Sequence, residues 1–284
     1  MNPPACTRWL RRSSRVLPLV TLILLTALGA AGCNKLKARD MLNKGVAAYK
    51  NGQFDQSIEF FKQAKELDPG LLNARLYLAT AYASQYIPGA PSEENVRKGE
   101  QAIAEFQEVL QTDPNNLNAI DGIGSILYQM AATPFTPAKF EESKTYHLKH
   151  IQLKPDSPEP YYWVGVIEWA LAFRGNSDLR KQYNEANPRK QVKDDQALPP
   201  KVREEYTAKF GPGVENGIQS LKTAIELRPD YEDAMAYLNL LYRRKADMVE
   251  SAAERENLLR VADELVDKVK EIKQKKMEAP PAKS

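Results

Sequence analysis

A 34-residue segment near the amino terminus, residues 38–71, has the layout of two short helices joined by a tight turn. Gly45 takes the slot where the two helices touch, Phe61 lies on the inner face of the second helix, and Pro69 ends the unit. Small residues let helix backbones approach, and large residues nearby fill the groove between them. Because one helix pair buries only part of its apolar face, the pattern predicts further pairs stacked on the first.

The same pattern recurs in register up to residue 250, so that about five helix pairs are expected. Small residues at the close-contact slot and prolines at the unit ends mark the later units, namely Ala79, Pro114, Gly124, Pro155, Gly165 and Pro229. The units resemble the tetratricopeptide repeat. That resemblance implies an all-α fold, a tetratricopeptide-type right-handed helical solenoid.

Stretches that break the repeat register set the remaining boundaries. The longest insert is charged, contains Pro188, Pro199 and Pro200, and includes the pattern of a short helix over residues 201–210. A helix over residues 251–277 has one continuous apolar stripe, which favours a capping helix, although pairing with a partner helix stays open. We expect a repeat domain over 38–250 with inserts at about 86–98, 132–138 and 174–213, and a disordered tail at 278–284.

The first 33 residues have a basic start, an apolar run from Val16 to Leu28, and small residues ending at Cys33. This is the layout of a signal peptide. The apolar run falls short of the roughly 20 residues that span a membrane. Ala30-Ala31-Gly32-Cys33 resembles the lipobox of bacterial lipoproteins, whose cysteine is acylated, with palmitate among the chains, and becomes the new amino terminus.

That resemblance implies a signal peptide over residues 1–32, a lipidated Cys33 and a short tether over 33–37. An ordinary cleaved signal and an uncleaved anchor remain as alternatives. By resemblance to enteric lipoproteins, Asn34 favours the outer membrane, facing the periplasm. Cys6 and Cys33 are the only cysteines, so the mature chain would have no intramolecular disulfide.

Charge gives no case for nucleic acid. The chain has 40 Lys and Arg residues, and the four arginines within residues 1–32 leave 36 against 37 acidic residues, a mature charge near −1. No metalloprotease, hydrolase, phosphate-loop, dinucleotide or paired-cysteine signature occurs, so we expect no enzyme and no cofactor.

The concave face of such solenoids, lined by the first helix of each pair, binds extended peptides or partner helices. Aromatic and mixed polar side chains suit that role, because Tyr and Trp supply contact area at low entropic cost. The alternative is that several of the matching residues only fill the space between repeats. The residues matching this face are Tyr49, Lys50, Leu76, Thr80, Asp121, Ser125, Tyr128, Gln129, Tyr162, Val166, Trp169, Leu240, Arg243 and Arg244.

His147 and His150 lie three residues apart, on one helical face, where they would supply two metal ligands. No cysteine or third histidine completes a site, and both fill core-facing repeat slots, which favours packing. The leading hypothesis is therefore a membrane-anchored scaffold, an adaptor or assembly factor in the bacterial envelope, which binds another exported protein. A metal or small-ligand binding protein using the two histidines, and a passive structural tether, are the alternatives.

Overall fold

The structure, a computed structural model, describes residues 16–278, with side chains described from residue 33 onward. This part of the chain forms ten α-helices and no strand. The expected signal peptide lies outside the described residues over 1–15, and its side chains are not described up to residue 32. Among the helices of residues 33–278, none is long and apolar enough to cross a membrane.

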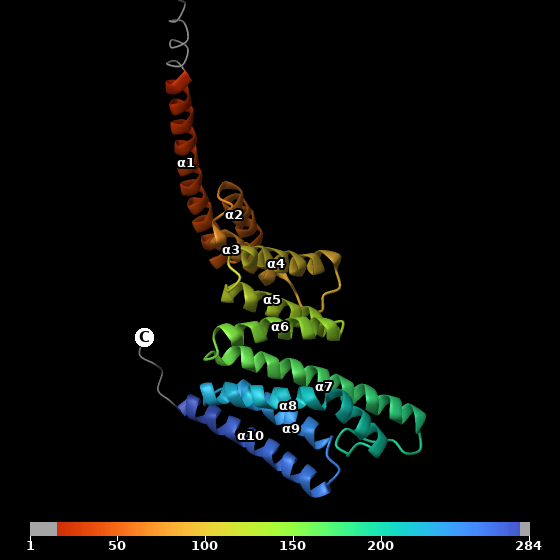
Figure 1. The fold of residues 1–284 in the computed structure, drawn as a ribbon. Coiled ribbons are helices and arrows are strands. Elements are labelled where there is room, and N and C mark those ends of the chain that lie inside the picture. Colours follow the sequence, from red (N-terminus) through yellow and green to blue (C-terminus); the bar gives the residue numbers. More distant parts are fainter. Residues whose placement is uncertain (1–15, 279–284) are drawn as a thin grey trace, which may run out of the picture. The chain divides into compact units, whose positions relative to one another are not determined.

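The chain divides into two compact units, residues 1–114 and 115–284. In the first unit each helix contacts the next one along the chain, so the helices form two consecutive pairs. The four helices, red to yellow in Figure 1, are α1 (Val16–Lys50), α2 (Phe54–Leu67), α3 (Leu72–Gln85) and α4 (Glu93–Thr112).

The second unit holds three consecutive helix pairs. Each helix again contacts the next, and α7 additionally contacts α9, the first helix of the following pair. Its six helices, green to blue in Figure 1, are α5 (Leu117–Ala132), α6 (Pro137–Leu153), α7 (Pro158–Ala186), α8 (Pro200–Leu227), α9 (Glu232–Ala246) and α10 (Ala252–Glu278).

The helix pairs pack at the glycine slots that the sequence indicates. A Cβ atom on Gly45 would lie 2.4 Å from Cε1 of Phe61, and one on Gly165 would lie 2.3 Å from Cγ of Leu221. Real Cβ atoms essentially never approach other atoms so closely. Phe61 is 1% exposed and Leu221 is fully buried. The predicted register of the first and fourth pairs is therefore confirmed.

Two boundaries differ from expectation. Residues 33–37, expected as a short tether, continue helix α1 without a break. The insert expected over 174–213 is mostly helical, because α7 runs on to Ala186 and α8 already begins at Pro200. Only residues 187–199 lie between the two helices.

Packing explains the two extensions. Leu179 from the added part of α7 and Tyr206 from the added part of α8 are buried in one hydrophobic cluster. Pro200 stands at the first position of α8, where its missing N–H costs no helical hydrogen bond. Pro212 lies inside α8, which continues across it, and Val214 two residues later is buried.

The last helix caps the second unit. Leu258 and Ala262 of the predicted apolar stripe are buried, and Leu265, Val269 and Ile272 are half-buried. At its far end Lys276 pairs with Asp230 and Glu232, at 3.2 and 2.8 Å, beside the start of α9. These contacts support the capping role that the sequence predicts.

Candidate protein-binding surface

A cluster of aromatic rings joins the first helices of the second unit. On α7, Tyr162, Trp169 and Phe173 repeat at helical spacing and so share one face. Tyr128 from α5 lies 5.1 Å, ring centroid to centroid, from Trp163 of α7. The sequence predicted three of these five residues, Tyr128, Tyr162 and Trp169, as surface residues, and the structure brings all three into the cluster.

Helix α9 completes the cluster with two further tyrosines. Tyr237 stands edge-on to both Tyr162 and Trp169, with centroids 5.7 and 5.2 Å away, and Tyr231 lies 5.2 Å from Tyr162. Aromatic pairs at 4.5–7 Å in such orientations attract each other beyond their buried area. We call Tyr128, Tyr162, Trp163, Trp169, Phe173, Tyr231 and Tyr237 the aromatic surface.

The aromatic surface is partly open. Phe173 is 48% exposed, and Tyr162, Trp169 and Tyr237 are partly buried against the core beneath. Within the described residues, the hydroxyls of Tyr128, Tyr162 and Tyr237 make no hydrogen bond to the protein, in contrast to the buried Tyr206, whose hydroxyl donates to the Ala172 carbonyl at 3.1 Å. These polar tips are available to a bound molecule.

Burial shapes the chemistry of these phenols. It raises the pKa of Tyr128 to about 12, with Tyr237 adding to the shift, and it also raises the pKa of Tyr162 and Tyr237. The neutral hydroxyl is therefore the form present at physiological pH. Each phenol both donates and accepts a hydrogen bond there.

The two predicted arginines of α9 are already paired within the protein. Arg243 donates to Asp263 at 2.5 Å and to Asn239 at 2.9 Å. Arg244 pairs with Asp247 at 3.4 Å, and its guanidinium lies 5.9 Å from the Phe173 ring centroid. Both arginines therefore have an internal carboxylate partner, and Arg244 shares its partner, Asp247, with Arg180.

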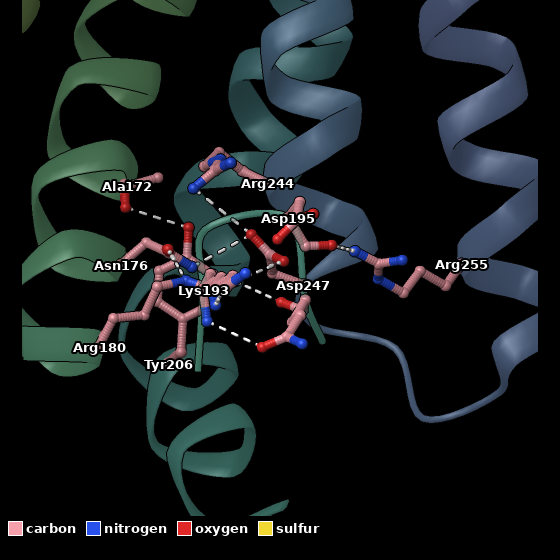
Figure 2. A network of polar contacts seen from close by, with 10 residues as sticks. Ala172, Asn176, Arg180, Lys193, Asp195, Tyr206, Arg244, Asp247 and Arg255 are labelled. Atoms are coloured by element: carbon pink, nitrogen blue, oxygen red, sulfur yellow. Dashed lines mark hydrogen bonds and ion pairs between the residues drawn. The ribbon is translucent and has the colours of Figure 1, made fainter. Parts of the chain in front are cut away.

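A buried polar network holds residues 187–199 beside this end of α9 (Figure 2). Arg180 of α7 donates to the carbonyls of Lys193 and Gln196, at 2.7 and 2.9 Å, and pairs with Asp247 at 3.1 Å. Both members of that pair are 4% exposed at the side chain. Arg255 of α10 donates to the Asp195 carbonyl at 2.8 Å. The connection between α7 and α8 is thus bonded to α7 and α10, and Arg180 links it to Asp247 at the end of α9.

The remaining predicted residues of the second unit are local in their contacts. Asp121 pairs with His150, Oδ1 to Nδ1 at 2.6 Å, and Gln129 donates to Ser125 at 3.3 Å. Leu240 is half-buried. Val166 is 1% exposed, which corrects its assignment to the surface, because it faces the core between repeats.

In the first unit the four predicted residues form a smaller polar group. Tyr49 and Ser84 hydroxyls lie 2.6 Å apart, and the Thr80 hydroxyl donates to the Leu76 carbonyl at 2.8 Å. Lys50 is exposed at the end of α1. Few aromatic rings gather here, so the second unit holds the stronger candidate.

Both histidines pack into the core, as their repeat slots indicate. His147 is 2% exposed, stacks on Trp163 at 5.9 Å between centroids, and fills the space over Gly124. Neither of its ring nitrogens has a hydrogen-bond partner, and burial lowers its pKa to about 4. In the described part of the chain, no group of three or more potential metal ligands of the His, Cys, Asp or Glu type occurs.

Sequence reasoning missed four residues of the aromatic surface: Trp163, Phe173, Tyr231 and Tyr237. Phe173 follows Trp169 by four residues on a helix longer than the repeat predicts, so its place depended on the extension of α7. Tyr237 lies three residues before the predicted Leu240, and so on the same face of α9. Extending the predicted face by one turn toward the start of α9 would have found it.

Comparison with known proteins supports the repeat fold. A tetratricopeptide-repeat family model matches residues 38–71. No curated protein matches the chain. Among solved structures, MamA is similar at 14% identity and a TM-score of 0.56, over 87% of this chain and 98% of that one.

Two further solved structures have a similar fold. MamA from Desulfovibrio magneticus RS-1, residues 41 to the end, is 15% identical with a TM-score of 0.55, over 84% of this chain and 96% of that one. YrrB, described as a tetratricopeptide-repeat protein with an unusual peptide-binding site, is 13% identical with a TM-score of 0.51, over 88% and 97%. The predicted fold class, an all-α tetratricopeptide-type solenoid, is thereby confirmed.

Proposed function

We propose that the protein is a membrane-anchored scaffold of the bacterial envelope, which binds a peptide segment or a helix of another exported protein on its aromatic surface. The fold supports a protein-interaction role. The observation that carries the proposal is the convergence of partly open rings from α5, α7 and α9, whose tyrosine hydroxyls have no partner within the described residues.

The physical reason is that large rigid aromatics pay little entropy when they are covered. Phe173 leaves nearly half of its surface in water. A partner covering it and its neighbours would remove apolar area from water at about 25 cal/mol per Å². The free hydroxyls would then fix the partner's orientation through hydrogen bonds.

Crosslinking in intact envelopes, followed by affinity capture and mass spectrometry, tests this role. We expect wild type to enrich at least one exported protein that a Trp169→Ala and Phe173→Ser double variant does not. Since Trp169 also packs against the core, Phe173→Ser alone serves as the variant that leaves the fold intact.

Tyr242→Ala is the matched control. Tyr242 is a half-buried tyrosine of the same helix as Tyr237, but five residues, or about 140°, further around it, where Lys222 of α8 lies 6.0 Å from its ring centroid. Equal capture by wild type and both surface variants would refute the proposed binding role.

The anchoring part of the proposal rests on Cys33. This cysteine is exposed, and it follows the small residues typical of a lipid-attachment signal. Acyl chains contribute about 0.8 kcal/mol per buried methylene, so two or three of them give permanent attachment. Because residues 33–37 are helical, Ala38 would lie only about 8 Å from the lipidated residue at 1.5 Å per residue.

Intact mass and membrane fractionation, compared between wild type and Cys33→Ser, test the anchor. We expect wild type to lose residues 1–32, gain acyl mass and sediment with membranes of the outer-membrane fraction. The variant should stay unprocessed. A soluble wild type with no acyl mass would contradict the anchor while leaving the binding role standing.

A further inference from the structure

We propose that the aromatic surface seats a positively charged side chain, a lysine or arginine of the partner, against Tyr162 and Tyr237 beside Asp233. This inference rests on the proposed binding role and names the chemistry of the segment that occupies the surface.

The rings supply the first part of the seat. A cation is attracted to the face of an aromatic ring when it lies within about 6 Å of the centroid, and more strongly when it is shielded from water. Tyr162 is surrounded by Trp163, Tyr231 and Tyr237, all with centroids 5.2 to 5.7 Å away. Several partly buried rings therefore meet at one place.

The protein already uses one of these rings in this way. The Arg228 guanidinium lies 4.5 Å from the centroid of Tyr231, and it is held there by an ion pair with Glu159. A ring face and a carboxylate together thus hold a cation at the edge of the cluster. Tyr162 and Tyr237 have no such cation on them within the described residues.

Asp233 supplies the carboxylate. It is exposed in the first turn of α9, and among the described residues no basic side chain pairs with it. Asp233 stands four residues, about one helical turn, before Tyr237, so the two side chains share one face of α9. The negative charge of Asp233 also helps to raise the pKa of Tyr162, Tyr231 and Tyr237, after the larger effect of burial. A partner cation would find a free carboxylate and unpartnered phenol oxygens together.

The opposite assignment, an acidic partner, fits less well. An incoming carboxylate would meet the free charge of Asp233 and the negative faces of the rings. Arg228, which lies on the Tyr231 ring, is already paired with Glu159. Arg243 and Arg244 lie ten and eleven residues further along α9, about 15 Å away, and are paired with Asp263 and Asp247. Charge complementarity therefore selects a basic segment.

A helix-capping role alone would also place an acidic residue in the first turn of α9, where it complements the helix dipole. Glu93 has that role in α4, in the first unit, with no aromatic cluster beside it in the described contacts. The substitution Glu93→Gln is therefore the matched control for Asp233→Asn.

The test is selection of dodecapeptides from a random phage-displayed library on the full-length chain, held in mild detergent, with the Phe173→Ser chain as the reference target. We expect the peptides that prefer wild type to share a lysine or arginine next to an apolar residue. For one selected peptide, fluorescence anisotropy should show roughly 5- to 30-fold weaker binding when its basic residue becomes Gln, the range of a shielded cation on rings.

Asp233→Asn should weaken that peptide several-fold and reduce the dependence of its affinity on salt, whereas Glu93→Gln should change neither. Selected peptides that are acidic or uncharged, or binding that is unchanged in Asp233→Asn, would overturn the cation seat and leave the binding role intact. Peptides selected equally on wild type and Phe173→Ser would refute the binding role itself.

Discussion

Trp169 on α7 and Tyr237 on α9 meet edge to face, with ring centroids 5.2 Å apart and ring planes at 75°. Helices α7 and α9 are the first helices of successive pairs, and α8 lies between them in the chain. The contact therefore joins two neighbouring helix pairs. The same rings form part of the aromatic surface. They therefore stabilise the second unit and also form part of the proposed binding surface.

A double-mutant cycle measures that link. We expect Trp169→Ala and Tyr237→Ala each to lower the free energy of unfolding, and the double variant to lose about 0.5 to 1.5 kcal/mol less than the sum. Urea unfolding followed by circular dichroism gives the three differences. Strict additivity would mean that the contact contributes nothing beyond buried area.

Phe61→Ala tests the packing of the first repeat. The side chain is 1% exposed, lies against Gly45 and stacks on Tyr77 at 5.7 Å between centroids. Its removal leaves a cavity between three helices, so we expect a loss of about 3 to 5 kcal/mol in the free energy of unfolding. Phe60→Ala, at a half-buried neighbour, is the control and should cost clearly less.

His147 predicts a pH dependence. Burial lowers its folded-state pKa to about 4 from the ordinary 6.5, so the unfolded chain takes up a proton first as the pH falls. Stability is fully present above about pH 6.5 and is lost as the pH falls from 6.5 toward 4. At pH 5 the loss from this group is about 2 kcal/mol, 1.5 units at 1.36 kcal/mol each.

Unfolding curves of wild type and His147→Leu at pH 7 and pH 5 isolate that contribution. The leucine variant cannot titrate at this position, so its stability should fall by about 2 kcal/mol less between the two pH values. An identical pH dependence in both proteins would show that the imidazole does not stay neutral in the folded core.

Replacing Arg180 alone should lower the free energy of unfolding more than replacing both Arg180 and Asp247. Arg180→Ala leaves a buried carboxylate whose pKa burial already raises, so we expect a loss of about 3 to 5 kcal/mol. It also frees the carbonyls of residues 193 and 196, so limited proteolysis within 187–199 should become faster. The double variant Arg180→Met and Asp247→Leu should recover part of the lost stability, because the buried carboxylate is then gone, while Arg244, the other partner of Asp247, is 18% exposed and keeps some contact with water.

The sequence was sufficient for the repeat register, because that register depends on local patterns such as Gly45 with Phe61. It was insufficient for the length of α7 and α8. The extension over 174–186 is charged on its outer side, and two of its buried residues, Leu179 and Arg180, have partners far away in the sequence. Such long-range partners leave no periodic signal.

The candidate surface was predicted in part for the same reason. Tyr128, Tyr162 and Trp169 stand at positions that the repeat assigns to the concave face. The arginines were placed correctly on α9, but their charges are balanced by Asp263 and Asp247, which sequence alone does not pair with them. The charge that the surface offers to a partner therefore became clear only from the structure.

The bonds that join residues 187–199 to α7 and α10 change how the last helix pairs of the second unit unfold. In repeat proteins each unit contacts only its neighbours, so end units fray first. Here Asp247 beyond α9 is bonded to Arg180 of α7, and Arg255 of α10 holds the Asp195 carbonyl. Opening the last helix pair therefore breaks bonds to the pair before it, so amides of α7, α8, α9 and α10 should exchange with solvent as one cooperative block.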